Sequence, residues 1–168
     1  MALSIKIWNG TRPRDISKFE LDSLLEMAGS GTDTTALTAR LISALYHLDN
    51  GQIDLADHEL DSIIESLEKE GNVILEGTVY SEKAFIAAAY RRDAETAQIY
   101  LNKAQKGYTE EHTIARAEAA LLILNEKFEE AKERANEGLI AAYDSIEKGS
   151  AIFEKEMLNI LSEGKLPE

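Results

Sequence analysis

The sequence predicts an all-α fold, and three observations carry this prediction. Apolar residues recur three, four and seven positions apart over most of the chain, which is the spacing of one helix face. Glycines and short polar runs divide the chain into segments of helical length. Ile5 and Ile7 give the only hint of the alternation typical of a strand. Long helices joined by very short turns lie antiparallel, so we expect stacked helix hairpins.

The N-terminal part of the chain is expected to lead into the first helix. Residues 1–15 are rich in turn-forming residues, and Pro13 disfavours helix just before it, so we expect an extended lead-in. Ser17, followed by Glu20 three positions later, has the pattern of a capping box that begins a helix. The glycines in 29–31 end that helix, because glycine adopts the left-handed conformation of a helix cap.

Three hairpins and a terminal helix account for the rest of the chain. Each hairpin combines an apolar-periodic helix, a short polar turn and a second apolar-periodic helix. The hairpins are predicted over about 34–71, 78–107 and 109–148, and a capping helix over 150–163. The capping helix is expected to cover the exposed end of the stack, as terminal elements of repeat arrays do. We therefore predict a single helical-repeat domain over 16–168.

A small residue recurs near the start of the second helix of each hairpin. Ala56 and Ala97 are 41 residues apart, and Ala97 and Ala131 are 34 apart. Recurrence of one supersecondary unit at such a period is the signature of a helical repeat array. Small side chains at these positions allow the two helices of a hairpin to approach closely.

The pattern resembles tetratricopeptide repeats, in which a turn glycine precedes an apolar residue and then a small one. Gly51, Ile53 and Ala56 match that run. Ala131 matches in the third hairpin, but Glu126 stands where the turn glycine would be, and the family's proline after the second helix is missing throughout. The resemblance implies a tetratricopeptide-like α-solenoid whose first helices line a concave groove that binds proteins or peptides.

A second resemblance is confined to residues 8–16. The run from Gly10 to Asp15, followed by a helix, resembles the segment that opens the soluble helical tail of some bacterial site-2-protease-like membrane metallopeptidases. It implies that the chain is such a tail without its enzyme. Trp8, the only tryptophan, is expected to plug the end of the stack, with an exposed contact as the alternative.

Composition excludes several classes of function. The net charge of −13, from 31 acidic and 18 basic residues, repels phosphate backbones and anionic lipids, so neither nucleic acid nor a membrane surface is an expected partner. No apolar run approaches the roughly 20 residues that a membrane span needs. Cysteine is absent, so disulfides and thiolate sites are excluded. We expect a soluble, acidic, cytoplasmic protein or, under the second resemblance, the soluble domain of a membrane protein.

Candidates for chemistry are few. The three histidines, His47, His58 and His112, form no His-Glu-x-x-His pair. His58 shares a helix face with Asp54 and Asp61, which could ligate a metal, but an exposed acidic face that solvates itself explains the same pattern. We therefore predict no enzyme, no metal and no cofactor.

Binding has better candidates. The polar side chains on the first helices of the hairpins are Thr38, Arg40, His47, Arg91 and Arg116. In the groove of a helical-repeat stack the arginines could pair with an acidic or carboxylate-ended peptide; alternatively they balance neighbouring acids. The leading hypothesis is a non-catalytic scaffold that binds a protein or peptide. The alternatives are the accessory tail of a membrane metallopeptidase and a small-ligand or metal-binding helical protein; the oligomeric state stays open.

Overall fold

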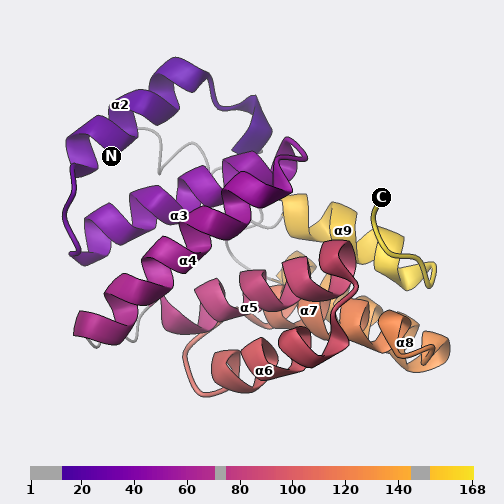
Figure 1. Ribbon diagram of the computed structural model, residues 1–168. Coiled ribbons are helices and arrows are strands. Elements are labelled where there is room, and N and C mark those ends of the chain that lie inside the picture. The colour runs from indigo at the N-terminus through magenta and orange to yellow at the C-terminus, as the bar shows by residue number, and fades with distance from the viewer. Residues whose placement is uncertain (1–12, 71–74, 145–151) are drawn as a thin grey trace.

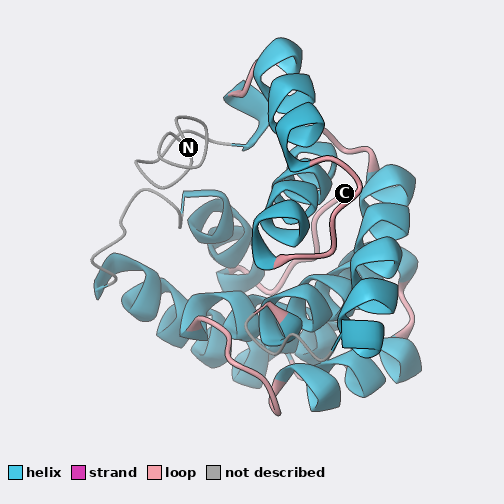
Figure 2. Ribbon diagram, turned by 90° about the vertical axis from the view of Figure 1, so that its left-hand side faces the viewer, coloured by secondary structure: helices cyan, strands magenta, loops and turns pink. Residues whose placement is uncertain are grey.

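The computed structural model describes residues 13–70, 75–144 and 152–168, and within these ranges the chain is helical and contains no strand (Figure 2). The prediction of an all-α fold is confirmed. Trp8 and the segment up to residue 12 lie outside the described residues. In the same three ranges, no helix has both the length and the apolar character that crossing a membrane requires.

The helices begin and end close to where the apolar periodicity places them. In chain order the described elements are η1 (Pro13–Asp15), α2 (Lys18–Ala28), α3 (Thr34–Asp49), α4 (Ile53–Glu70), α5 (Glu76–Ile86), η2 (Ala87–Arg91), α6 (Ala94–Ala104), α7 (Glu111–Leu124), α8 (Phe128–Asp144) and α9 (Ile152–Ser162). Of the lead-in expected to be extended, the structure describes residues 13–15, which form a turn of 3₁₀-helix, η1. A π-helical turn, η2, continues α5, which the periodicity did not indicate.

Side-chain caps fix the starts of several helices. Ser17 and Glu20 form the predicted capping box: the Ser17 hydroxyl accepts from the Glu20 amide, and the Glu20 carboxylate accepts from the Ser17 amide. Asp33 caps α3 by accepting from Ala36, and Asp93 caps α6. Each cap satisfies an amide that has no partner within its own helix.

The short turns between paired helices share one backbone feature. Each contains a residue in the left-handed conformation: Gly51 (φ 71°), Arg92 (φ 57°) and Glu126 (φ 62°). Each of these residues stands five positions before one of the small residues Ala56, Ala97 and Ala131, and all three alanines are fully buried. The same turn geometry and the same buried alanine therefore occur three times along the chain.

Consecutive helices pack in pairs, α3 with α4, α5 with α6 and α7 with α8 (Figure 1). Helix α7 is the most central, since it also packs on α5, α6 and α9. One apolar core runs through α3 to α9. A smaller cluster holds η1 and α2 against α3 through Ile16, Leu21 and Ile42.

Helix α9 returns along α8 and covers part of α7. The Lys155 ammonium lies 4.6 Å from the centre of the Tyr143 ring near the end of α8, and further along α9 Leu158 lies against Gly138. The two helices therefore run antiparallel. In Figure 1, α9 (yellow) lies beside the turn that joins α3 to α4, so it connects the two ends of the described fold.

Candidate functional site: the seat of the C-terminal helix

The inward face of α9 contains a carboxyl group. Leu158 and Leu161 are fully buried, and Glu154, four and seven positions before them, is only 8% exposed. This spacing places all three side chains on one face of the helix. A carboxyl group on a buried face is costly unless other groups satisfy it, so its surroundings define the site.

Beneath α9 lies a buried ion pair that joins α5 and α7. Arg116 Nη2 of α7 lies 2.5 Å from Glu82 Oε1 of α5, and the two side chains are 0% and 1% exposed. The Arg116 guanidinium also lies 4.4 Å from the centre of the Phe85 ring. We call Glu82, Arg116 and Glu154 the buried charge cluster.

The cluster holds two carboxyl groups and one guanidinium. The pKa of Glu154 is raised to about 7, mainly by burial; Arg116 opposes this rise, and the nearby carboxylates of Glu82 and Asp49 contribute to it. Among the described residues, none donates a hydrogen bond to Oε2 of Glu154 or to Oε2 of Glu82. Glu154 can therefore gain or lose a proton close to neutral pH, whereas an ionised Glu154 adds an excess negative charge to the core.

Two further titratable groups border the cluster. Burial lowers the pKa of His112, and the positive charge of Arg116 lowers it further. Burial raises the pKa of Tyr90, and Arg116 opposes that shift. Arg116, Glu82 and Glu154 are all buried, so no dissolved molecule reaches them in this structure. The arrangement is therefore suited to holding a helix, and offers no open site for chemistry.

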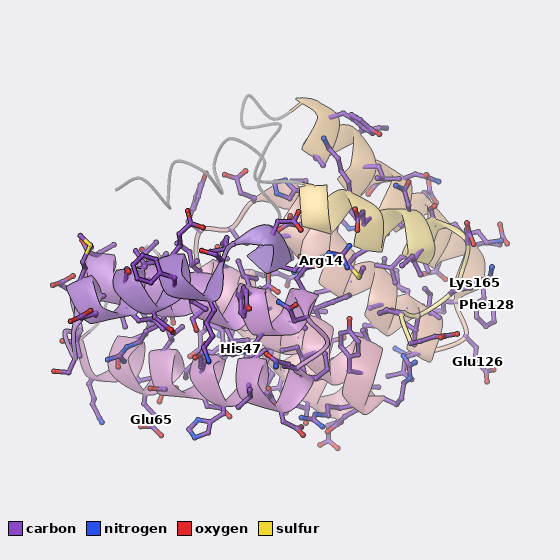
Figure 3. All side chains as sticks on the ribbon, turned by 90° about the horizontal axis from the view of Figure 1, so that it is seen from above. Arg14, His47, Glu65, Glu126, Phe128 and Lys165 are labelled. Atoms are coloured by element: carbon purple, nitrogen blue, oxygen red, sulfur yellow. The ribbon has the colours of Figure 1, made fainter. Side chains whose placement is uncertain are left out.

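The seat of α9 extends to a hollow at the α3–α4 turn. This hollow of about 260 Å³ lies between Leu48, Tyr90 and Met157, among other residues. Arg14 borders it: the Arg14 amide donates to Asp49 (3.0 Å), and its guanidinium lies 3.9 Å from Glu156 of α9 (Figure 3). We define the α9 seat as the surface that α9 covers, formed by Glu82 of α5, Tyr90 of η2, Ala115 and Arg116 of α7, and Gly138 of α8.

Three of the residues predicted to line a groove lie on α3, away from this seat. Thr38 borders a separate hollow between α2 and α3. Arg40 and His47 lie near Glu59 of α4. Burial raises the pKa of Glu59, and the hydrogen bond from Ser43 and the charges of Arg40 and His47 partly oppose this rise. His47 Nε2 is 3.7 Å from Glu59. These side chains take part in contacts between helices of the first pair.

Arg91 pairs with acids of α4. Its guanidinium contacts Asp54 and lies 3.6 Å from Asp57. Lys83 extends this row of ion pairs, with its ammonium 2.5 Å from Asp57 and 2.7 Å from Asp61. Asp54 and Asp61, considered above as metal ligands, thus contact cationic side chains. No group of three or more metal-ligating side chains occurs in the part of the chain that the structure describes.

Arg116, predicted to line the groove, is completely buried. Its described contacts include Glu82 and Phe85 of α5. Sequence reasoning did not identify Glu82 or Glu154 as its neighbours. One signal was present: Glu154 falls on the same helix face as Leu158 and Leu161, and a charged side chain in an apolar stripe indicates a buried partner.

Comparisons of the chain with models of protein families, with curated proteins and with solved structures gave no match. The geometry of the α9 seat is therefore the basis for a functional assignment.

Proposed function

We propose that this protein is a non-catalytic, cytoplasmic helical-repeat scaffold that binds a protein or peptide partner as a helix. The repeat interpretation is supported by the three short turns, each with a left-handed residue five positions before a fully buried alanine. In a tetratricopeptide-like stack, α3, α5 and α7 are the first helices of the pairs, and such helices line the groove. Nucleic acid is an unfavourable partner because the net charge is −13.

One observation carries the proposal: the chain's own α9 lies as an amphipathic helix on α7, the first helix of the third pair, and on its partner α8. It inserts Leu158 and Leu161 into the core and places Glu154 beside Arg116 of α7 and Glu82 of α5. A surface that accepts an amphipathic helix through a few anchoring residues has the form of a helix-in-groove recognition site.

The polar residues on α3 and η2 line the part of the proposed groove that lies away from the α9 seat. Thr38, Arg40 and His47 are half-buried, and Arg91 is exposed. The arginines and His47 lie near carboxylates of α4 in the structure. Carboxylates of an acidic partner can replace those of α4 as the ion-pair partners of these side chains. The replacement costs little free energy, because exposed ion pairs contribute only about 0.2–1 kcal/mol each.

Site-directed cross-linking tests the location of binding. The chain has no cysteine, so single cysteines with a photoreactive label can replace Tyr90 or Glu156 at the hollow, and Leu55 or Ile99 on the outer faces of α4 and α6. With native cell extract, we expect one partner to cross-link from the hollow and to be competed away by unlabelled protein. Cross-links that arise only from Leu55 and Ile99 positions would contradict the proposal.

A further inference from the structure

The α9 seat is covered by a helix that does not match it in charge. Glu82 already pairs with Arg116, so Glu154 brings a second carboxyl group to a single guanidinium. Burial of an ionised carboxyl without a full set of partners is strongly unfavourable. A helix that served only as a permanent cover would be held more tightly with an uncharged side chain at this position.

The contact between α9 and its seat is also incomplete at one end. Among the side chains of 154–162 that the structure describes, Glu154, Leu158 and Leu161 are buried, while Lys155, Glu156 and Met157 stay half-buried. The hollow of about 260 Å³ beside Met157 leaves the contact between α9 and the α3–α4 turn incompletely packed. Within 154–162, two leucines, one mismatched carboxyl group and the half-buried Met157 thus anchor α9.

We propose that the α9 seat is an exchangeable binding site, and that its partner is an amphipathic helix with an uncharged hydrogen-bonding residue followed by leucines four and seven positions later. Helix α9 occupies the site in the absence of that partner and competes with it. This inference rests on the proposed function, because it specifies which helix the scaffold binds and where.

The chemistry of the partner follows from the cluster. A glutamine at the position of Glu154 keeps a hydrogen-bonding group beside Arg116 but adds no second negative charge to Glu82. The pKa of Glu154 rises from 4.5 to about 7 on burial, so at pH 8 this position favours an uncharged side chain over the native glutamate on the order of 100-fold in affinity. At pH 5 the preference falls to a few-fold, because the free glutamate is then only partly ionised.

A labelled peptide tests exchange on the full-length protein. The probes are peptides of residues 152–168 with the native Glu154 or with Glu154→Gln, and binding is followed by fluorescence anisotropy at pH 8 and pH 5. Replacing α9 leucines in the chain, Leu158→Ala with Leu161→Ala, weakens the resident helix, so we expect the peptide to bind at least tenfold more tightly than to the native chain. Asn159→Ala, an exposed change on the same helix, is the matched control and leaves affinity unchanged.

A second variant avoids destabilising the fold. Glu154→Gln in the chain tightens the resident helix at pH 8, so the peptide is expected to bind on the order of 100-fold more weakly, whereas Glu154→Gln in the peptide has the opposite effect. Cross-linking Tyr143→Cys to Lys155→Cys with a short bismaleimide fixes α9 in place and abolishes peptide binding. The two native side chains are adjacent, with the Lys155 ammonium 4.6 Å from the Tyr143 ring centre.

The outcomes separate this inference from the proposed function. If no peptide binds to any variant, or if the cross-linked chain binds as well as the native chain, α9 is a fixed part of the fold and the inference is wrong. The proposed function fails separately, when a partner from cell extract cross-links only at Leu55 and Ile99. A cross-linked chain that still captures its partner at the hollow would retain the function and overturn the exchange of α9.

Discussion

Gly138 of α8 and Leu158 of α9 lie so close that no side chain fits between them. A Cβ at position 138 would be 2.9 Å from Leu158 Cδ2 and 2.7 Å from the Cβ of Ala115. Leu158 can move by rotating its side chain, but the Cβ of Ala115 is fixed to α7. Gly138 thus permits α7, α8 and α9 to meet.

Gly138→Ala is expected to destabilise the protein. Alanine in a helix interior gains about 0.5–1 kcal/mol over glycine, but overpacking a well-packed core costs about 1–3 kcal/mol. We expect a net loss of about 1 kcal/mol in the free energy of unfolding, measured with urea. Asn136→Ala, at an exposed position of the same helix, serves as the control and is expected to be neutral or slightly stabilising. An equal effect of both changes would contradict the close approach.

Glu154→Gln is expected to stabilise the protein at alkaline pH but not at acidic pH. The pKa of Glu154 rises from 4.5 to about 7 on folding, so its protonated form favours the folded state. That contribution is complete below about pH 4.5 and is lost as the pH rises to about 7. Glutamine stays neutral, so the variant should gain up to about 3 kcal/mol over the native chain at pH 8.

Urea unfolding of both chains at several pH values measures this difference. His112, whose pKa is lowered by burial, loses its own contribution as the pH falls below about 6.5, but it does so in both chains and cancels. A difference between the chains that stays constant from pH 4.5 to pH 8 would show that Glu154 is not buried as described.

The sequence predicts much of this fold because the rules that decide it are local. Apolar periodicity places α3, α4, α7 and α8, and the capping box at Ser17 is present as expected. The left-handed conformation of Arg92 and Glu126 could not be predicted, because non-glycine residues rarely adopt it without the constraint of neighbouring helices.

The site itself depends on contacts that spacing does not reveal. Glu82 and Arg116 are 34 residues apart, and Glu154 follows Arg116 by 38, so their association depends on how α5, α7 and α9 pack. The sequence pattern identifies the arginines on the first helices. Helix packing decides whether each arginine forms its ion pair at the surface or in the interior. Arg91 pairs with Asp54 beside solvent, whereas Arg116 pairs under α9.

Arg116→Leu is expected to cost about 3–5 kcal/mol, because it leaves the Glu82 carboxylate buried without its cation. The double change Arg116→Leu with Glu82→Leu removes both charges, so its cost should be at least 2 kcal/mol below the sum of the two single changes. Urea unfolding at pH 6, where Glu154 is largely protonated, isolates this pair. Additive effects would mean that the two side chains do not interact.

Glu126→Gly is expected to stabilise the protein by about 0.5 kcal/mol. Glu126 has a φ of 62° and an exposed side chain, so glycine relieves a left-handed conformation that costs other residues about 1–2 kcal/mol. Greater freedom of glycine in the unfolded chain offsets about 0.4–1 kcal/mol of that gain.

Gly51→Ala is the reciprocal control. Gly51 has a φ of 71° and no atom near its missing Cβ, so only backbone strain changes, and a loss of about 0.5 kcal/mol is expected. Thermal and urea unfolding measure both variants. Arg92, the left-handed residue of the second turn, is a poorer test because its guanidinium donates to the carbonyls of Ala89 and Pro167, which glycine would leave without that donor. Because the two turns adopt the same geometry, we expect the free energy of unfolding to fall in Gly51→Ala and to rise in Glu126→Gly. A destabilising Glu126→Gly would show that the Glu126 side chain stabilises its turn by more than the backbone strain costs.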